Sequence, residues 1–414
     1  MSLKGNALIA QSGGPTVVIN ASLIGAVDAA REAAEIEEIY GAIHGMDGIL
    51  HENLTALLQE DPTILQGLRT TPSAALGTSR LKPKQADLER ALEVFQAHNV
   101  RYFFYIGGND SQLACHLVSQ LALQSDWEMR IMGIPKTIDN DLPITDNCPG
   151  FASAARLAAS ATQFVAKDAE AFGEAEVIEI MGRHAGWVTG AAQTGRREDR
   201  DAPHLVYLPE VPVKPEEFIE DCRAAYEQYG YLVVAVSEGF AFAESERVTT
   251  SDKVDEFGHA RLSGVAEALS GVVEEALGKR CRTDRLGNLH RCFTYTASAV
   301  DLEEAYGVGQ VAVQQAVAGE NNQMVIIQRQ SAAGEEPFRF SCGLTPLTSV
   351  ADIERTVPRE WINERGNGVT QEFIDYAKPL MRGTGEPTPL GLPSYPRLAG
   401  HAVERKLAPY VRPK

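Results

Sequence analysis

The sequence has few cysteines, no long apolar run and no recognisable secretion signal. Its six cysteines are scattered over 414 residues without a CxxC pair, which argues against a disulfide-stapled scaffold and against a thiolate zinc site. No apolar run approaches the about 18 residues that a membrane helix needs, and the N-terminus lacks a signal-peptide pattern. We therefore expect a cytoplasmic protein without a membrane segment.

Positive charge is also scarce. Lys and Arg number 38 against 56 Asp and Glu, a net charge of −18 at pH 7. This balance argues against nucleic acid or an anionic membrane as a partner. It still allows an anionic small molecule as substrate, provided that basic side chains gather at one place. The 44% hydrophobic residues suffice for a full globular core.

The order of apolar runs predicts an α/β fold. Short apolar segments alternate with stretches of helical spacing, which is typical of βαβ units and parallel sheets. We expect strands at 7–10, 102–106, 130–134, 177–180, 204–208, 232–236, 324–328 and 338–342. Because the pattern starts again near residues 142–152, we expect two Rossmann-like domains with parallel-rich sheets and an active-site cleft between them.

The same pattern suggests the domain boundaries. We assign residues 1–145 to a first α/β domain and residues 146–300 to a second. Residues 301–414 are expected to form a C-terminal segment that packs on both domains. Within it, residues 383–397 are rich in Gly and Pro, which predicts an irregular surface segment.

Two expected strands end in loops that suit an anion or a cation. Gly13 and Gly14 lie between a strand and a helix, where backbone N–H groups and the helix N-terminus can bind an anion. A tight turn with nothing bound is the alternative. After the second strand, Asn109 and Asp110 offer the oxygen ligands that Mg²⁺ prefers. Both residue types are also good helix N-caps, and on this segment alone capping is the favoured interpretation.

The segment Pro135–Asp141 concentrates polar side chains after a third strand. Lys136, Thr137, Asp139 and Asp141 lie on this short stretch. A carboxylate here can accept a proton from a substrate hydroxyl, while the lysine neutralises charge on a transferring phosphoryl group. An Asx-type turn with a surface salt bridge is the alternative. The density of polar groups at a strand's carboxyl end favours the catalytic interpretation.

The second half of the chain adds arginines and one carboxylate at strand ends. Arg183 and Glu238 each follow an expected strand, and Arg282 and Arg291 belong to a basic run. An arginine fork suits bidentate recognition of phosphate, and Glu238 can accept hydrogen bonds from sugar hydroxyls. Taken alone, Arg282 is more often a solvated surface residue, and we expect His184 to be a loop residue.

Taken together, these segments resemble the phosphofructokinase family, and within it the pyrophosphate-dependent members. The matching segments, in the family's order, are SGGP at 12–15, GTSR at 77–80, IGGNDS at 106–111, PKTIDND at 135–141, MGRHAGW at 181–187, SEGF at 237–240 and LGNLHR at 286–291. The resemblance implies a glycolytic phosphotransferase that moves a phosphoryl group reversibly from pyrophosphate to the 1-hydroxyl of fructose 6-phosphate, with Mg²⁺ as cofactor. It also implies a homo-oligomer, either a dimer or a tetramer.

The resemblance assigns roles to individual residues. Asp139 would be the catalytic base, assisted by Lys136 and Arg183. Fructose 6-phosphate would be bound by Thr137, Ile138, Asp139, Met181, Gly182, Arg183, Glu238, Arg282 and Arg291. Pyrophosphate would be bound by Gly13, Gly14, Arg80, Asp110 and Lys136, and the metal by Asn109 and Asp110. The first domain would then bind the phosphoryl donor and the second the sugar phosphate.

Two positions bear on the choice of donor. Relatives that use ATP have glycine where this chain has Asp110 and Lys136, the pattern of pyrophosphate users. The carboxylate adds bulk and negative charge where a nucleotide would lie, and the lysine adds a cation for pyrophosphate. An ATP-dependent 6-phosphofructokinase is the alternative.

Four positions depart from the family's pattern. Asn288 and His290 replace residues that are often His or Tyr and Gln in the LGxxxR segment. Asn109 stands where many relatives have a metal-binding aspartate, and Glu174 where relatives often carry an arginine that crosses the subunit interface.

Interpretations outside the family fit less well. A dinucleotide dehydrogenase would need a GxGxxG that is missing after the first strand. A non-catalytic sugar-phosphate sensor would not need Asp139 beside Lys136.

Overall fold

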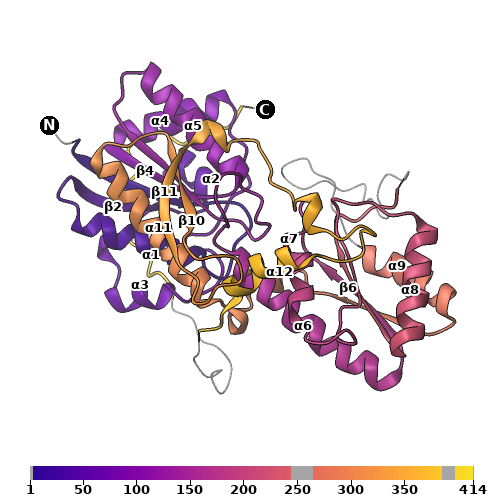
Figure 1. The fold of residues 1–414 in the computed structure, drawn as a ribbon. Helices are drawn as coiled ribbons and strands as arrows, with labels where there is room; N and C mark the ends of the chain where they lie inside the picture. Colours follow the sequence, from indigo (N-terminus) through magenta and orange to yellow (C-terminus); the bar gives the residue numbers. More distant parts are fainter. Residues whose placement is uncertain (1–2, 244–263, 385–396, 414) are drawn as a thin grey trace.

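The protein consists of two α/β bodies, each built on its own sheet (Figure 1). The computed structural model describes residues 3–243, 264–384 and 397–413, so most of the Gly- and Pro-rich segment lies outside the described residues. Within these ranges, one sheet has seven strands in the order β11-β10-β5-β4-β1-β2-β3 and the other has four in the order β7-β8-β6-β9. The predicted α/β architecture with two parallel-rich sheets is confirmed.

The larger sheet has a parallel centre and antiparallel edges. Its strands are β1 Gly5–Gln11, β2 Ile36–Ala42, β3 Leu54–Ala56, β4 Val100–Gly107, β5 Arg130–Pro135, β10 Gln323–Arg329 and β11 Phe340–Pro346. The five inner strands run parallel, whereas β3 and β11 pair antiparallel at the two edges. The carboxyl ends of β1, β4 and β5 therefore meet at one edge of the sheet.

Helices cover both faces of the larger sheet because its central strands are apolar on both sides. In β4, Phe103 and Tyr105 pack against one helical layer, and Tyr102 and Phe104 pack against the other. The first layer comprises α2 Gly45–Leu50, α4 Gln85–Ala97 and α5 Asn109–Gln124, and the second comprises α1 Ile19–Glu32, α3 Pro62–Leu68 and α11 Ala299–Ala318.

The second sheet is wholly parallel and is likewise covered on both faces. Its strands are β6 Ala175–Ile180, β7 Leu205–Tyr207, β8 Leu232–Ser237 and β9 Cys281–Arg285. One face carries α6 Phe151–Phe172, α7 Trp187–Ala191 and α12 Gln371–Ala377, and the other carries α8 Pro215–Tyr229 and α9 Val265–Leu277. The short α10 Leu289–Cys292 follows β9. None of the described helices combines the length and apolarity needed to cross a membrane.

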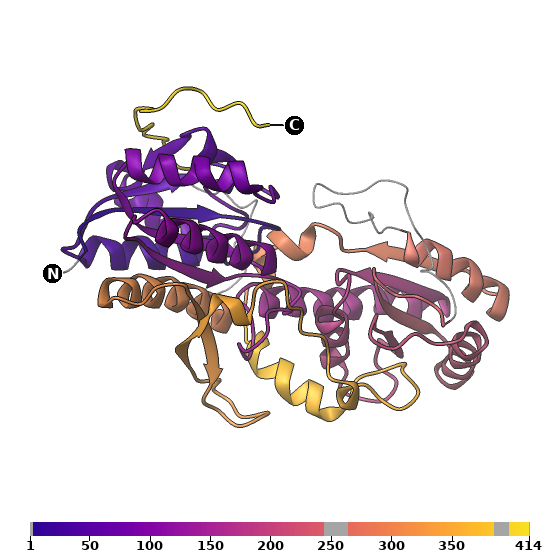
Figure 2. The ribbon, with the colours of Figure 1, turned by 90° about the horizontal axis from the view of Figure 1, so that it is seen from above.

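The C-terminal third of the chain contacts both bodies. Strands β10 and β11 extend the larger sheet, whereas α12, yellow in Figure 2, packs beside α6 and α7 of the second body. The last described residues return to the larger body, where the Glu52 carboxylate accepts hydrogen bonds from the backbone N–H groups of Lys406 and Leu407. The two bodies are thus tied together by the end of the chain as well as by the connection into α6.

Candidate active site

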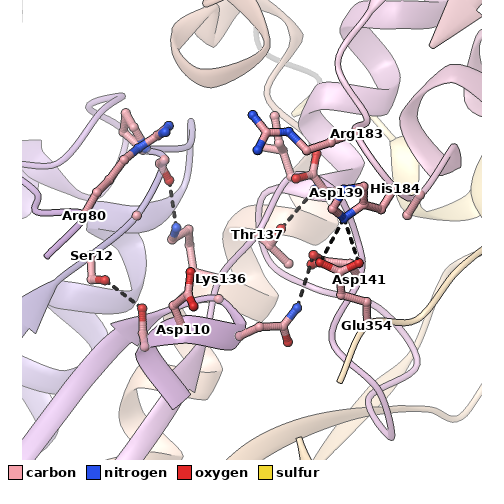
Figure 3. Close-up of a pocket in the computed structure, with 18 of the residues that line it drawn as sticks. Ser12, Arg80, Asp110, Lys136, Thr137, Asp139, Asp141, Arg183, His184 and Glu354 are labelled. Carbon is pink, nitrogen blue, oxygen red and sulfur yellow. Dashed lines mark hydrogen bonds and ion pairs between the residues drawn. The ribbon is translucent and has the colours of Figure 1, made fainter. Parts of the chain in front are cut away.

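A pocket of about 230 Å³ lies where loops of the two sheets meet (Figure 3). The loops after β1, β4 and β5 contribute from the larger sheet, and the loops after β6 and β8 from the second. Most of the site residues predicted from the sequence line this pocket: Gly13, Gly14, Arg80, Asn109, Asp110, Lys136, Thr137, Ile138, Asp139, Arg183, Glu238 and Arg291. The carboxyl ends of the strands thus form the site, as expected for parallel sheets.

Three predicted residues do not line the pocket. The Gly182 carbonyl accepts hydrogen bonds from the Ser237 hydroxyl and the Gly239 N–H, and Gly182 itself has a φ of 147°. Met181 and Gly182 therefore shape the loop that carries Arg183. Arg282 lies on β9, outside the pocket, where it forms ion pairs with Asp168 at 2.6 Å and with Glu174 at 3.0 Å.

The double glycine leaves room for two cationic side chains. A Cβ atom on Gly13 would lie 3.1 Å from the Lys136 Nζ, and one on Gly14 would lie 3.2 Å from the Arg291 Nε. Gly13 has a φ of 74°, a conformation that other residues adopt only with strain. The Lys136 ammonium donates a hydrogen bond to the Gly14 carbonyl at 2.7 Å. The loop is thus shaped to hold positive charge at this side of the pocket.

Hydrogen bonds also fix the loop that carries Arg80. The Thr78 hydroxyl donates to the Gly13 carbonyl at 2.6 Å, and the Gly13 N–H donates to the Ser79 carbonyl at 3.1 Å. In the view of Figure 3, Arg80 and Arg183 lie on opposite sides of the pocket, with Lys136 between them. This acidic protein therefore gathers cations at one place.

The buried position of Lys136 changes its acidity. The residue is 3% exposed, and burial, followed by the nearby Arg291 guanidinium, lowers the pKa of its ammonium to about 7. Burial likewise lowers the pKa of Arg291. Both effects reflect the cost of holding positive charge away from water before an anion is bound. A polyanionic ligand would relieve this cost.

The pKa of Asp139 is raised, whereas that of Lys136 is lowered. Burial, followed by the nearby Asp141 and Glu238 carboxylates, raises the pKa of the Asp139 carboxyl to about 7. The loop is held locally, because the Asp139 N–H donates to the Thr137 hydroxyl at 3.1 Å. A carboxylate whose pKa lies near neutrality is suited to accept a proton from an alcohol.

Two buried oxygens near Asp139 fit a divalent cation. The Oδ1 atoms of Asn109 and Asp141 have no hydrogen-bond partner in the described part of the chain, and the Asn109 amide donates to the other Asp141 oxygen at 3.3 Å. Buried oxygens normally have a partner, so each of these two oxygens is a candidate ligand for a hard cation. The Oδ1 of Asp110 instead forms an ion pair with the Lys82 Nζ at 3.0 Å. No cluster of three His, Cys, Asp or Glu residues suited to a metal occurs among the described residues.

The pocket also contains residues for which no role was predicted. Ser12 and Asp141 belong to the recognised motifs, and the Ser12 hydroxyl hydrogen-bonds with that of Ser111 at 2.6 Å. His184 lines the pocket and pairs with Glu354 at 3.0 Å. Glu354 lies 170 residues further along the chain, so no local pattern could have indicated it.

Comparison with known proteins gives one consistent result. The family model described as phosphofructokinase matches residues 6–316. The chain is 39% identical over 413 residues to the pyrophosphate–fructose 6-phosphate 1-phosphotransferase of Halomonas elongata, covering 97% of this chain and 98% of that protein. It is 42% identical over 392 residues to the protein of the same name from Rhodospirillum rubrum, covering 93% and 96%.

A solved structure agrees with these relatives. The crystal structure of a pyrophosphate-dependent phosphofructokinase from Marinobacter aquaeolei superposes with a TM-score of 0.90 at 38% identity, covering 99% of this chain and 100% of that one. The motifs of the pocket, the family match and the full-length similarity lead to the same assignment. The chain belongs to the phosphofructokinase family.

Proposed function

We propose that the protein transfers a phosphoryl group reversibly from pyrophosphate to the 1-hydroxyl of fructose 6-phosphate, giving fructose 1,6-bisphosphate and phosphate. The observation that carries this proposal is the buried Lys136 over the double glycine, together with Asp110 at the edge of the same pocket. The full-length relatives named for this reaction support it. Steady-state turnover measured with pyrophosphate and with ATP on one preparation tests it, and a preference for ATP would overturn it.

The mechanism follows from the placement of charge. Asp139 accepts the proton of the 1-hydroxyl, the sugar oxygen attacks one phosphorus of pyrophosphate, and the bond from that phosphorus to the bridging oxygen breaks. Phosphate leaves with the electrons of that bond. Lys136 neutralises charge on the transferring group, while Arg80, Arg183 and Arg291 hold the two anions in line. Catalysis is thus positioning combined with electrostatic stabilisation.

In this proposal the two bodies bind different substrates, the larger one the phosphoryl donor and the second one the sugar phosphate. The part of the larger body that falls within the expected donor domain 1–145 supplies Gly13, Gly14, Arg80 and Lys136. The second sheet, within the expected sugar domain 146–300, supplies Arg183 and Glu238. The glycolytic role, and a location in the cytoplasm, belong to the same proposal.

We further propose that the protein is a dimer or tetramer. Arg282 is paired with Asp168 and Glu174 outside its own chain's pocket. The sugar-phosphate role predicted for Arg282 would therefore require it to reach the pocket of a neighbouring copy. Light scattering coupled to gel filtration tests the assembly, and a strictly monomeric active enzyme would overturn it.

Magnesium is the cofactor that we propose. Asn109 and Asp141 would hold it, and the bound ion would neutralise charge on the donor. Asp110, predicted as a ligand, instead pairs with Lys82 and is proposed to act in donor choice.

A chelator should abolish turnover, and added Mg²⁺ should restore it. Asn109→Ala should raise the Mg²⁺ concentration for half-maximal rate by about tenfold, because one oxygen ligand is lost. Binding of Mn²⁺ followed by electron paramagnetic resonance gives a readout independent of turnover. Unchanged Mn²⁺ affinity in Asn109→Ala would contradict this assignment.

The acidities of Asp139 and Lys136 predict a narrow pH optimum. Asp139 must be ionised to accept a proton, so kcat/KM should fall as the pH drops below its raised pKa of about 7. Lys136 must be protonated, so kcat/KM should fall again as the pH rises above its lowered pKa of about 7. Bound pyrophosphate stabilises the ammonium, so the alkaline fall of kcat should lie at higher pH than that of kcat/KM.

The alkaline fall can be assigned by substitution. In Lys136→Arg the side chain keeps its charge at every accessible pH, so the alkaline limb of kcat/KM should move upward while the acidic limb stays in place. An alkaline limb that is identical in the wild type and in Lys136→Arg would show that another group titrates there.

A further inference from the structure

The loop that carries the proposed catalytic base has an unusual backbone. Asn140, the residue after Asp139, has a φ of 57°, and Ile144 has a φ of 70°. Such conformations are uncommon outside glycine, and a β-branched residue rarely adopts them. Residues held this way persist only where surrounding contacts enforce them. Surrounding contacts must therefore hold the backbone of residues 139–146 in this conformation.

Arg355 supplies most of those contacts. Its guanidinium donates to three carbonyls of the loop: to Asn140 at 2.9 and 3.2 Å, to Thr145 at 2.7 Å and to Asp146 at 2.9 Å. Its backbone N–H donates to the Asp141 carbonyl at 2.7 Å. One residue thus fixes four backbone carbonyls on the C-terminal side of Asp139, including the carbonyl of the strained Asn140.

Tyr376 holds the same loop from a second direction. Its hydroxyl donates to the Asp146 carbonyl at 2.7 Å and accepts a hydrogen bond from the Asn140 side-chain amide at 2.7 Å. The Asn140 side chain in turn accepts from the Cys148 N–H at 3.0 Å. Tyr376 is 8% exposed, so water competes little for these bonds.

Arg355 also contacts the loop that carries Arg183. Its guanidinium lies 4.8 Å from the ring centre of Trp187, whose indole N–H donates to the Arg355 carbonyl at 3.2 Å. The preceding residue, Glu354, pairs with His184 at the pocket. Residues 354 and 355 therefore connect the Asp139 loop of one body to the Arg183 loop of the other.

From these contacts we propose that Arg355 and Tyr376 are positioning residues for the reaction. They hold Asp139 and Asp141 in register with the proposed sugar-binding loop. Arg355 and Tyr376 themselves lie beyond residues 6–316, the range that the family model matches. Neither lines the pocket, so their effect passes through the backbone of residues 139–146. The inference rests on the proposed function only for its kinetic readout.

The chain offers a matched control in Arg359. Its guanidinium also donates to three backbone carbonyls, those of Ile362, Asn363 and Glu364, but these lie in its own segment and not in the Asp139 loop. Arg355→Ala and Arg359→Ala therefore remove the same kind of contact from different places. A difference between them separates positioning of the site from general stability.

The experiment measures kcat, both KM values and backbone hydrogen exchange in the full-length variants. Arg355→Ala should lower kcat by about 100-fold with KM values within about threefold, because the base is misplaced while the anion-binding side chains remain. Exchange of the amides of residues 139–148 should accelerate. Arg359→Ala should keep kcat within about twofold of wild type and leave that exchange unchanged.

Two milder variants keep the test valid if Arg355→Ala does not fold. Tyr376→Phe keeps the ring and removes only the hydroxyl contacts, and Arg355→Lys keeps one charge with fewer donors. Each should lower kcat by about tenfold and accelerate exchange in residues 139–148. Wild-type kcat and exchange in both, or an equal loss in Arg359→Ala, would overturn the proposal. Hydrogen exchange needs no turnover, so a wild type inactive with pyrophosphate would refute the proposed function and leave the positioning role testable.

Discussion

Asp139→Asn should lose about three orders of magnitude in kcat while binding both substrates almost normally. The amide has the volume and shape of the carboxylate but cannot accept the proton of the sugar hydroxyl, and a positioned general base contributes about 10²–10⁴-fold. The arginines and Lys136, which bind the two anions, are unchanged. Steady-state kinetics combined with calorimetric titration of fructose 6-phosphate measures the two effects separately.

The same substitution should stabilise the fold at alkaline pH. The pKa of Asp139 is raised in the folded protein, so the folded state binds more protons than the unfolded state between the two pKa values and loses stability as the pH rises. The amide introduced by Asp139→Asn carries no charge, so the variant should have a higher Tm than wild type at about pH 8, with the difference vanishing near pH 4. An inactive variant that is more stable than wild type cannot be explained by misfolding.

Asp61→Asn is the matched control. Asp61 caps α3 by accepting a hydrogen bond from the Thr63 N–H at 2.7 Å, and asparagine caps helices equally well. This variant should match wild type in kcat and in Tm. If Asp139→Asn instead kept kcat within about tenfold of wild type, another group would be the base.

The central strands could be predicted from the sequence because they are buried on both faces. The runs at 7–10, 102–106, 130–134, 177–180 and 232–236 correspond to β1, β4, β5, β6 and β8. Parallel strands between two helical layers are continuously apolar, and a short apolar run followed by helical spacing indicates them directly. The loops after these strands carry the motifs, so most of the pocket-lining residues on those loops were predictable with them.

The more polar strands near the sheet edges could not be predicted. In β2, Glu37 and Glu38 are exposed, and β9 is Cys-Arg-Thr-Asp-Arg, which we interpreted only as part of a basic run. A strand near an edge has fewer apolar neighbours, so its hydrophobic pattern is weak. Because β9 was not predicted as a strand, the position of Arg282 could not be predicted either. On β9 its guanidinium forms ion pairs with Asp168 and Glu174 outside the pocket.

The other features of the site that could not be predicted depend on contacts between residues far apart in the sequence. Glu354 and Arg355 lie in a segment with no motif, and only the path of the C-terminal chain across both bodies brings them to the site. Asp141 stands in the PKTIDND motif, yet its buried oxygen without a hydrogen-bond partner among the described residues is a property of packing. Sequence spacing indicates which loops form a site, but it does not indicate which distant segment positions them.

Replacing both Asp110 and Lys136 by glycine should change the donor from pyrophosphate to ATP. The Lys136 ammonium lies 2.7 Å from the Gly14 carbonyl and fills the space over the double glycine. Lys136→Gly opens this space and removes the cation, so kcat/KM for pyrophosphate should fall by about 10²–10³-fold. Asp110→Gly removes a carboxylate that would repel a nucleotide phosphate, at a cost of about 1 kcal/mol for glycine in the first turn of α5. The ratio of kcat/KM for ATP over pyrophosphate should rise by more than about 10³-fold in the double variant.

Lys136→Met separates the two effects of the lysine, because methionine keeps most of its volume without its charge. This variant should lose pyrophosphate turnover as severely as Lys136→Gly, since the cation is gone. Combined with Asp110→Gly it should still not accept ATP, since the space stays filled. If Asp110→Gly with Lys136→Met accepted ATP as well as Asp110→Gly with Lys136→Gly does, charge alone would determine the donor. If the variant with both substitutions were indifferent to ATP, neither the carboxylate nor the lysine would be what excludes the nucleotide, and the selecting contact would have to lie elsewhere along the donor side of the pocket.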